Sequence, residues 1–435
     1  MYPCPMLKSS RFFHFENFPA SSSLALGAML LLGTLHVSGC GDDGGETSGG
    51  TTGGQQTTSS SSGGGTPGSS SSSGADPGTT SASAGGGDGG SNPAGTGGAD
   101  PAGTGGSDPA GTGGTGGAGT GGGGDGGSLP ESGLPPAPGA GNVPKPAGAV
   151  GGFKVIDWAG FTGAVSYSFD DSNSSQISNY DALNGLGVPF TFYLQTGKQE
   201  SNNAVWTRAL MDGHELANHT QSHRDNDDGS DTDAATKFIR DKFGIEVYTM
   251  AAPNGSSVYT NIAKTRFMIN RGVSNAVIAP RGNADPFTLP SYIPPANASA
   301  SVMDAEITSA RAAKGWRTFC IHGFSGGSDG AYNAFPLQSL LDHVKKTKDL
   351  GDMWIDSIVN VGAYWLGQKA IPVNGTASGS DTTWTWTLPA HFPPGKYVRV
   401  TVTGGTLKQN GAPLKWDPHG YYEVALDAKS VTLSP

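Results

Sequence analysis

Between about residue 41 and residue 150 the chain consists almost entirely of Gly, Ser, Thr, Ala and Pro. Such a stretch buries too little apolar surface to offset the entropy lost on ordering, so we expect a disordered tether over residues 40–150. The hexapeptide Pro-Ala-Gly-Thr-Gly-Gly recurs at Pro93, Pro101 and Pro109, but it offers no apolar position for the stacked core of a repeat protein. About 285 of the 435 residues therefore remain to fold.

The N-terminus has the features of an export signal over residues 1–39. Lys8 and Arg11 precede an apolar run at residues 24–35, which is too short to cross a bilayer comfortably. The run Val-Ser-Gly-Cys that ends at Cys40 resembles the lipobox of bacterial lipoproteins. The resemblance implies export, lipidation of Cys40 and anchoring at the membrane of the bacterial cell envelope, with exposure at the surface. An ordinary signal peptide with an incidental cysteine is the alternative.

Charge and cysteine content argue against a nucleic-acid-binding protein and against a disulfide-stabilised domain. The formal net charge is −10 and no basic run lies outside the N-terminus, which argues against a nucleic-acid partner. Of the three cysteines, Cys4 lies in the predicted signal and Cys40 at the predicted lipidation site. Cys320 is then alone in the folded part, so we expect a buried thiol and no intramolecular disulfide.

Residues 151–370 alternate short β-rich runs with helical ones. This alternation predicts a parallel sheet, and about seven strands favour a distorted, incomplete (β/α) barrel over a doubly wound sheet. In both architectures, functional groups gather at the carboxyl ends of the strands. The sequence therefore predicts an α/β catalytic domain with its site at that edge.

Residues 371–435 change to Thr, Val and Trp alternation with Gly and Pro turns. This pattern predicts a small C-terminal all-β domain resembling a β-sandwich. Trp384 and Trp386 share a strand face by the period-two rule, so they form either a sugar-stacking platform or part of the core.

Five titratable residues stand at predicted strand ends. Asp170 and Asp171 close one strand, so that one carboxylate can bind a metal while the other acts as a base. His219 and His223 are four residues apart, a spacing that we expect to place both on one side of a helical turn. His322 ends a late apolar strand before a glycine-rich loop. Two histidines with one carboxylate suit Zn²⁺, Co²⁺, Ni²⁺ or Fe²⁺ better than Mg²⁺.

These motifs resemble those of the polysaccharide deacetylase family, carbohydrate esterase family 4, whose members share the NodB homology domain. Ser-Phe-Asp-Asp at residues 168–171 is similar to the first motif, residues 218–223 to the second and Cys-Ile-His at 320–322 to the last. The resemblance covers about residues 155–368 and implies these roles: Asp170 as catalytic base, Asp171, His219 and His223 as metal ligands, His322 as general acid, and the backbone N–H of Asn254 as oxyanion donor.

The resemblance also implies an activity. A metal-activated water, with Zn²⁺ as the expected metal, would remove acetyl groups from a polysaccharide or oligosaccharide. The substrate would be the N-acetyl group of a chitin-type or peptidoglycan glycan, or the O-acetyl group of xylan. We expect a monomer whose partners are this glycan and the membrane.

Two family features are not found at their usual places. Ala251 and Ala252 precede Pro253 where many members have an arginine that orients the base, and Arg271 or Arg281 could replace it. Asp285 and Asp356 are candidates for an aspartate that tunes the acid histidine. The alternatives are a catalytically weakened surface glycan-binding protein, or a hydrolase of another C–N bond on the same barrel.

Overall fold

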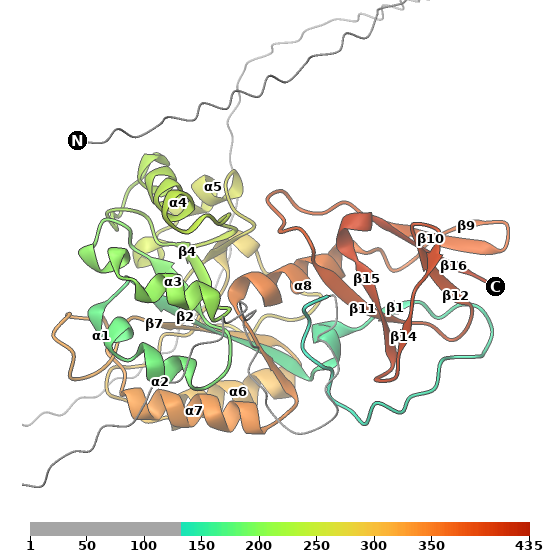
Figure 1. Ribbon diagram of the computed structural model, residues 1–435, viewed down its shortest axis with the longest axis horizontal. Helices are drawn as coiled ribbons and strands as arrows, with labels where there is room; N and C mark the ends of the chain where they lie inside the picture. Colours follow the sequence, from blue (N-terminus) through green and yellow to red (C-terminus); the bar gives the residue numbers. More distant parts are fainter. Residues whose placement is uncertain (1–131) are drawn as a thin grey trace, which may run out of the picture. The chain divides into compact units, whose positions relative to one another are not determined.

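The computed structural model describes residues 132–435 (Figure 1). The predictions of a signal peptide at residues 1–39, of lipidation at Cys40 and of a tether up to residue 131 lie outside the described residues. Within residues 132–435, no helix is both long enough and apolar enough to cross a membrane.

A seven-stranded parallel sheet forms the first part of the described chain. Its central strand is β2 (Gly163–Asp170), in which every residue is buried. One edge of β2 pairs with β7, and the other edge pairs with β8 near its start and with β3 near its end. Beyond β3 the curled sheet continues through β4 and β5 to β6. The bounds of these strands are β3 (Thr191–Leu194), β4 (Glu215–Asn218), β5 (Thr249–Ala251), β6 (Ile269–Arg271), β7 (Trp316–Ile321) and β8 (Met353–Ile355).

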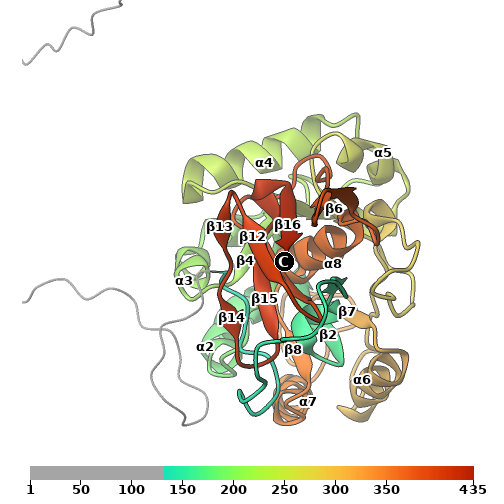
Figure 2. The ribbon, with the colours of Figure 1, turned by 90° about the vertical axis from the view of Figure 1, so that its right-hand side faces the viewer.

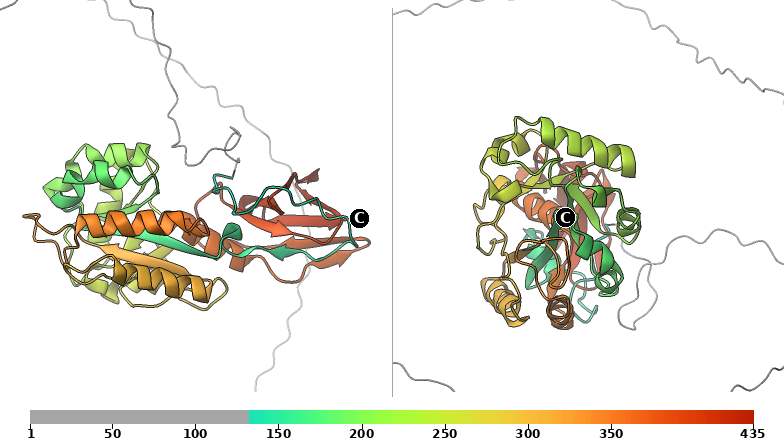
Figure 3. Two further views of the ribbon diagram at one scale, coloured as in Figure 1. Left: turned by 90° about the horizontal axis from the view of Figure 1, so that it is seen from below. Right: turned by 90° about the vertical axis from the view of Figure 1, so that its left-hand side faces the viewer.

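Helices surround this sheet, as expected for a (β/α) barrel (Figure 3). Helices α6 and α7 pack against each other, and α6 also contacts β2 and β7. The fold prediction of a distorted, incomplete barrel of about seven strands is confirmed. The helices are α1 (Ser174–Ser178), α2 (Tyr180–Asn184), α3 (Val205–Met211), α4 (Ser230–Phe243), α5 (Val258–Lys264), α6 (Ser301–Ala313), α7 (Leu337–Asp349) and α8 (Ile358–Ala370). Short 3₁₀ turns lie at η1 (Asp157–Gly160), η2 (Gln199–Asn202), η3 (Pro253–Gly255), η4 (Pro286–Thr288) and η5 (Leu426–Ala428).

The two faces of the sheet belong to different apolar clusters. Val165, Tyr167 and Phe169 of β2 pack beneath the surrounding helices, whereas Ala164 belongs to the cluster formed with α8. Because side chains alternate along a strand, Ser166, Ser168 and Asp170 share the face of Ala164. Ser168 donates a hydrogen bond to the Phe319 carbonyl at 2.7 Å, which satisfies its buried hydroxyl. Asp170 therefore ends β2 on the inner face of the curled sheet.

Helix α8 packs at the start of the strands. The first residues of β3, β4 and β5 are Thr191, Glu215 and Thr249, and both threonines donate to the Glu215 carboxylate. Glu215 also accepts from Val359 N at 2.9 Å, so a buried carboxylate caps the helix N-terminus. This helix fills the inner face at one end, and the opposite, carboxyl end is left for the functional site.

Two antiparallel sheets form the C-terminal part, which confirms the predicted all-β region (Figure 2). Side chains of both sheets belong to one apolar cluster with α8, so the sheets pack face to face and against the barrel. One sheet has the order β1 (Lys154–Val155), β11 (Tyr397–Thr401), β15 (Tyr421–Ala425) and β14 (Trp416–Asp417); the other has β13 (Ala412–Pro413), β12 (Thr406–Gln409), β16 (Ser430–Ser434), β10 (Asp381–Thr385) and β9 (Thr376–Ser378).

The β-domain also includes chain that precedes the barrel. Strand β1 pairs with β11, although we placed residues 151–370 in the catalytic domain. Residues 132–150, which we assigned to the tether, pack on the C-terminal sheets: Val143 N donates to Pro418 O at 2.7 Å and Gly148 N to Thr403 O at 3.0 Å. Composition did not predict this packing, because the backbone N–H and C=O groups of a Gly/Pro-rich segment can form hydrogen bonds with an open sheet edge whatever side chains the segment carries.

Trp384 and Trp386 do not form an exposed platform. Each is 6% exposed, and the Trp384 ring stacks on Phe153 with ring centroids 4.1 Å apart. Trp386 donates its indole N–H to Leu426 O at 2.8 Å. Of the two interpretations of this pair, the core role is the one that the structure shows.

Candidate active site

Asp170 is held inside the barrel by an arginine from another strand. Arg271, at the end of β6, donates a hydrogen bond from its guanidinium to Asp170 Oδ2, and both side chains are almost completely buried. The Arg271 guanidinium also lies over the ring of Tyr193, 5.4 Å from its centroid. Burial favours a raised pKa for Asp170, but the charges of Arg271, His219 and His322 outweigh it and lower this pKa below its usual value.

Of the two arginines suggested by the sequence, only Arg271 lies here. Arg281 forms a half-exposed ion pair with Asp157 at 3.4 Å. Ala251 pairs with Arg271 in the β5–β6 register, so the two positions are neighbours on the inner face. The guanidinium is thus supplied from the adjacent strand instead of from the third motif.

Asp171, His219 and His223 converge on a common point beside Asp170. Asp171 Oδ1 is 3.2 Å from His219 Nε2 and 3.5 Å from His223 Nε2. His219 Nδ1 lies 2.9 Å from the Ala251 carbonyl, an acceptor, so Nδ1 carries the proton and the Nε2 lone pair is free. Burial favours a raised pKa for Asp171, but the neighbouring imidazoles lower it well below its usual range.

This group fits a metal ion. In the described part of the chain, neither Asp171 Oδ1 nor His219 Nε2 has a hydrogen-bond partner, although both are buried. A buried polar atom without a partner is costly unless something else, such as a cation, satisfies it. Two imidazoles and one carboxylate are a common ligand set for Zn²⁺ and related divalent ions.

The expectation of a helical turn for His219 and His223 is wrong. Residues 219–229 form a loop, with φ of 60° at Thr220 and 53° at His223, both in the left-handed region. Side chains stabilise this backbone: Asn218 Oδ1 accepts from Thr220 N at 2.8 Å, and Thr220 Oγ1 accepts from His223 N at 3.0 Å. The two imidazoles come together because the loop folds back on itself, not because residues four apart share one side of a helix.

His322 follows β7 and closes the opposite side of the site. Its Nε2 lies 4.0 Å from Asp170 Oδ2, and its ring is packed edge-on against the exposed Tyr332, with centroids 5.2 Å apart. Burial lowers the pKa of His322.

Neither candidate for a tuning aspartate reaches His322. Asp285 accepts from Phe287 N at 2.9 Å and caps η4. Asp356 is buried and accepts from Trp354 Nε1, Ser357 N and Asn360 Nδ2 at 2.7–3.1 Å. In residues 132–435, His322 Nδ1 is a buried atom without a hydrogen-bond partner.

Asn254 lies at the rim of the same site. It has a left-handed backbone with φ of 53°, and its amide Nδ2 donates to Asp225 Oδ1 at 2.6 Å. It lines a cavity of about 400 Å³ together with the five predicted residues and with Ala252, Gly255, Arg271, Val273, Ile293 and Tyr332. The structure thus brings together all six residues that the sequence selected for the site.

Gln176 is a site residue that the sequence analysis did not select. Its side-chain Nε2 donates to the backbone carbonyl of Asp170 at 2.5 Å and to that of His322 at 2.7 Å. Asn173 Nδ2 also donates to the His322 carbonyl at 2.7 Å. Because the acceptors are main-chain atoms, and the His322 carbonyl lies in a distant segment, no residue pattern in the sequence marks these contacts.

The polysaccharide deacetylase family model matches residues 162–267. This segment contains Asp170, Asp171, His219, His223 and Asn254, and it ends before Arg271, Cys320 and His322. The predicted resemblance to this family of deacetylases, which are hydrolases, is therefore confirmed over residues 162–267.

Several solved structures are similar to part of the chain. A putative polysaccharide deacetylase from Mycobacterium smegmatis is 14% identical, with 52% of this chain and 98% of that chain covered and a TM-score of 0.40. A family 4 acetyl xylan esterase from Clostridium thermocellum, solved with a cobalt ion, is 16% identical over 46% and 89% of the two chains, with a TM-score of 0.33. The peptidoglycan deacetylase PdaC from Bacillus subtilis is 12% identical over 46% and 89%, with a TM-score of 0.29. No curated protein matches this chain.

Proposed function

We propose that this chain is a metal-dependent hydrolase that removes acetyl groups from a polysaccharide or oligosaccharide. The observation that carries the proposal is the convergence of Asp171, His219 and His223 beside the buried Asp170–Arg271 pair. A divalent cation at Asp171, His219 and His223, with Zn²⁺ as our expectation, would supply Lewis-acid chemistry and lower the pKa of water.

Asp170 would act as the general base. Its carboxylate is kept ionised by Arg271, and its Oδ2 lies only 3.7 Å from His219 Nε2. A carboxylate in this position can take the proton of a water molecule that attacks the acetyl carbonyl. Arg271 fixes the direction of the carboxylate, since a buried charge-assisted hydrogen bond restricts its rotation.

His322 and Asn254 would act on the other atoms of the amide or ester group that is cleaved. His322 faces Asp170 across the site at 4.0 Å and can deliver a proton to the leaving amine or alkoxide. In the described chain, the Asn254 backbone N–H makes no backbone hydrogen bond, so it is free to stabilise the oxyanion of the tetrahedral intermediate.

The substrate that we propose is an acetylated glycan: a chitin-type or peptidoglycan N-acetyl group, or a xylan O-acetyl group. Support comes from the family match and from the cavity, where exposed Tyr332 and Val273 offer apolar contact beside the polar groups. Aromatic rings beside polar groups suit the alternating apolar and hydroxyl surfaces of a sugar.

The structure favours this proposal over the alternative of a catalytically weakened glycan-binding protein. Its motivation was the altered third motif, the C-terminal β-domain and the long tether. Arg271 contacts Asp170 in place of a third-motif arginine, and Trp384 and Trp386 of the β-domain are buried.

The test is acetate release from acetylated chitooligosaccharides, peptidoglycan glycan and acetylxylan. We expect Asp170→Asn to lower kcat by about 10²–10⁴-fold and Asp171→Asn to remove the bound metal. Asp349→Asn, an exposed carboxylate on α7, is the matched control and should retain both. Equal acetate release by wild type, Asp170→Asn and chelator-treated protein would contradict the proposal.

We also propose that the protein is exported and anchored to the bacterial cell envelope through lipid on Cys40. The small residues before Cys40 and the long low-complexity stretch after it support this localisation. Cell fractionation tests it: wild type should be in the membrane fraction and Cys40→Ala should leave it. The same distribution for both proteins would rule out the anchor.

A further inference from the structure

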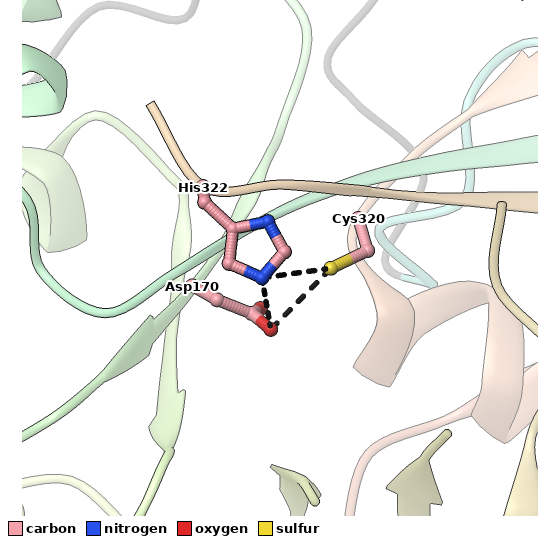
Figure 4. Close-up of side chains that lie close together, drawn as sticks. All are labelled: Asp170, Cys320 and His322. Carbon is pink, nitrogen blue, oxygen red and sulfur yellow. Dashed lines mark hydrogen bonds and ion pairs between the residues drawn. The ribbon is translucent and has the colours of Figure 1, made fainter. Parts of the chain in front are cut away.

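Cys320 lies beside Asp170 and His322 and has no role in the proposed reaction (Figure 4). Its Sγ is 3.4 Å from Asp170 Oδ2 and 3.9 Å from His322 Nε2, and Nε2 is 4.0 Å from Oδ2. Cys320 precedes His322 by two residues, so both side chains point to the inner face from the end of β7. Figure 4 shows the three side chains directed toward one another.

The three donor atoms are spaced for a metal ion. In a tetrahedral site with a metal–sulfur bond of about 2.3 Å and metal–nitrogen or metal–oxygen bonds of about 2.0–2.1 Å, neighbouring donors are roughly 3.3–3.5 Å apart. The shortest separation here falls within this range, and the other two exceed it by about half an ångström, which small side-chain rotations can close. The Asp171–His219–His223 group has similar separations of 3.2 and 3.5 Å.

A second observation points to a ligand at this place. Asp170 Oδ1 is buried and, among residues 132–435, has no hydrogen-bond partner, because Arg271 and Cys320 both contact the other oxygen. A cation between the three side chains can bind Oδ2, the oxygen nearest the thiol and the imidazole, or it can bind Oδ1, which leaves the Oδ2–Arg271 pair intact. A thiolate and a carboxylate would balance the charge of a divalent ion, and sulfur selects thiophilic ions such as Zn²⁺ and Cd²⁺ over Mg²⁺ and Ca²⁺.

We propose that Asp170, Cys320 and His322 form a second, inhibitory site for a thiophilic divalent cation, adjacent to the Asp171–His219–His223 group. As the sulfur–metal bond forms, the Cys320 thiol loses its proton to solvent, and no electrons are transferred. The ion then occupies both side chains that the proposed reaction uses for proton transfer, so turnover stops. The inhibitory effect rests on the proposed function, whereas the binding of the ion does not.

Cd²⁺ titration of the full chain, loaded beforehand with one equivalent of Zn²⁺, tests the site directly. Cadmium–thiolate bonds give an ultraviolet charge-transfer band, and equilibrium dialysis counts the bound ions. We expect the wild type to develop the band and to bind one more ion than Cys320→Ala, in which the band is absent. The double variant Cys4→Ser/Cys40→Ser is the matched thiol control and should keep the band. A band that persists in Cys320→Ala, or that is lost in the double variant, overturns the proposal.

Inhibition gives the second measurement. We expect excess Cd²⁺ or Zn²⁺ to inhibit wild-type acetate release, with at least a tenfold higher inhibitory concentration for Cys320→Ala. Identical inhibition curves would contradict the inhibitory role. Circular dichroism and the Tm of Cys320→Ala and of the smaller change Cys320→Ser check that the fold is intact. If no protein released acetate, the proposed function would fail, and the cadmium band would still decide whether the site exists.

Discussion

Arg271 and Asp170 form a buried ion pair although 101 residues separate them in the sequence. The pair joins the ends of β6 and β2, which are not neighbours in the sheet. Arg271 therefore reaches across the inner face of the curled sheet, which is possible because that face is concave. This contact accounts for how the proposed base is held when the third motif contains Ala251 and Ala252.

Removal of Arg271 should affect both activity and stability. We expect Arg271→Ala to lower kcat/KM by about a hundredfold, because Asp170 loses its orienting partner. The free energy of unfolding should fall by about 3 kcal/mol, since a buried carboxylate is left unpaired. Arg281→Ala, in a half-exposed pair, should change stability by less than about 1 kcal/mol.

The double variant Arg271→Ala/Ala251→Arg is a sharper form of this test. It returns a guanidinium to the neighbouring strand position, and partial recovery of kcat relative to Arg271→Ala is expected. Steady-state kinetics and chemical denaturation measure both effects. Unchanged kinetics in Arg271→Ala would show that Asp170 does not need this partner.

Gln176 should act as a positioning residue for the base and the acid. Gln176→Met preserves side-chain length but removes both donors to the Asp170 and His322 carbonyls, which should lower kcat about tenfold with little change in KM. Gln338→Met, on the exposed surface of α7, is the control. A loss of Tm without a change in kcat would assign Gln176 a purely structural role.

Arg399 should contribute to the stability of the joined barrel and β-domain. Its guanidinium pairs with Glu423 at 3.2 Å and donates to Ala159 O and Pro135 O, both at 2.8 Å. Arg399→Met leaves the buried Ala159 carbonyl and the partly buried Pro135 carbonyl and Glu423 carboxylate unpaired, and it should lower the free energy of unfolding by about 3 kcal/mol. Lys415→Met, at an exposed site of the same domain, should have little effect. Equal denaturation midpoints for the two variants would refute this role.

His214 should make stability depend on pH. It is 4% exposed, its Nδ1 accepts from Phe190 N at 3.0 Å, and burial lowers its pKa to about 4. Because the unfolded chain binds this proton near pH 6.5, stability is complete above that pH and falls as pH decreases toward 4. The loss amounts to about 3 kcal/mol.

Denaturation of wild type and His214→Gln between pH 4 and 7 measures this contribution. The glutamine variant cannot titrate and should have a flatter stability profile over this range. Parallel profiles for the two proteins would mean that other groups cause the pH dependence.

Much of the fold and part of the site follow from local patterns. Strand–helix alternation is a local property, and it correctly predicts the incomplete barrel and the C-terminal all-β region. Asp170, Asp171 and His322 could be selected because each stands where a buried strand ends, and parallel strands present these ends at one edge. The helical turn predicted for His219 and His223 was wrong. Glycine often marks a positive φ in a sequence, but here positive φ values occur at Thr220 and His223, so no glycine marks the loop.

The sequence by itself determined which residues carry reactive groups and that the strands bring them to one edge. Both depend only on residue type and on the periodicity of neighbouring residues. Only the tertiary structure decided that Arg271 faces Asp170 while Arg281 lies elsewhere, that Gln176 joins two backbone carbonyls, and that β1 pairs with β11. These contacts connect segments roughly 100 to 250 residues apart, and long-range contacts depend on sheet curvature and register, which no local pattern specifies.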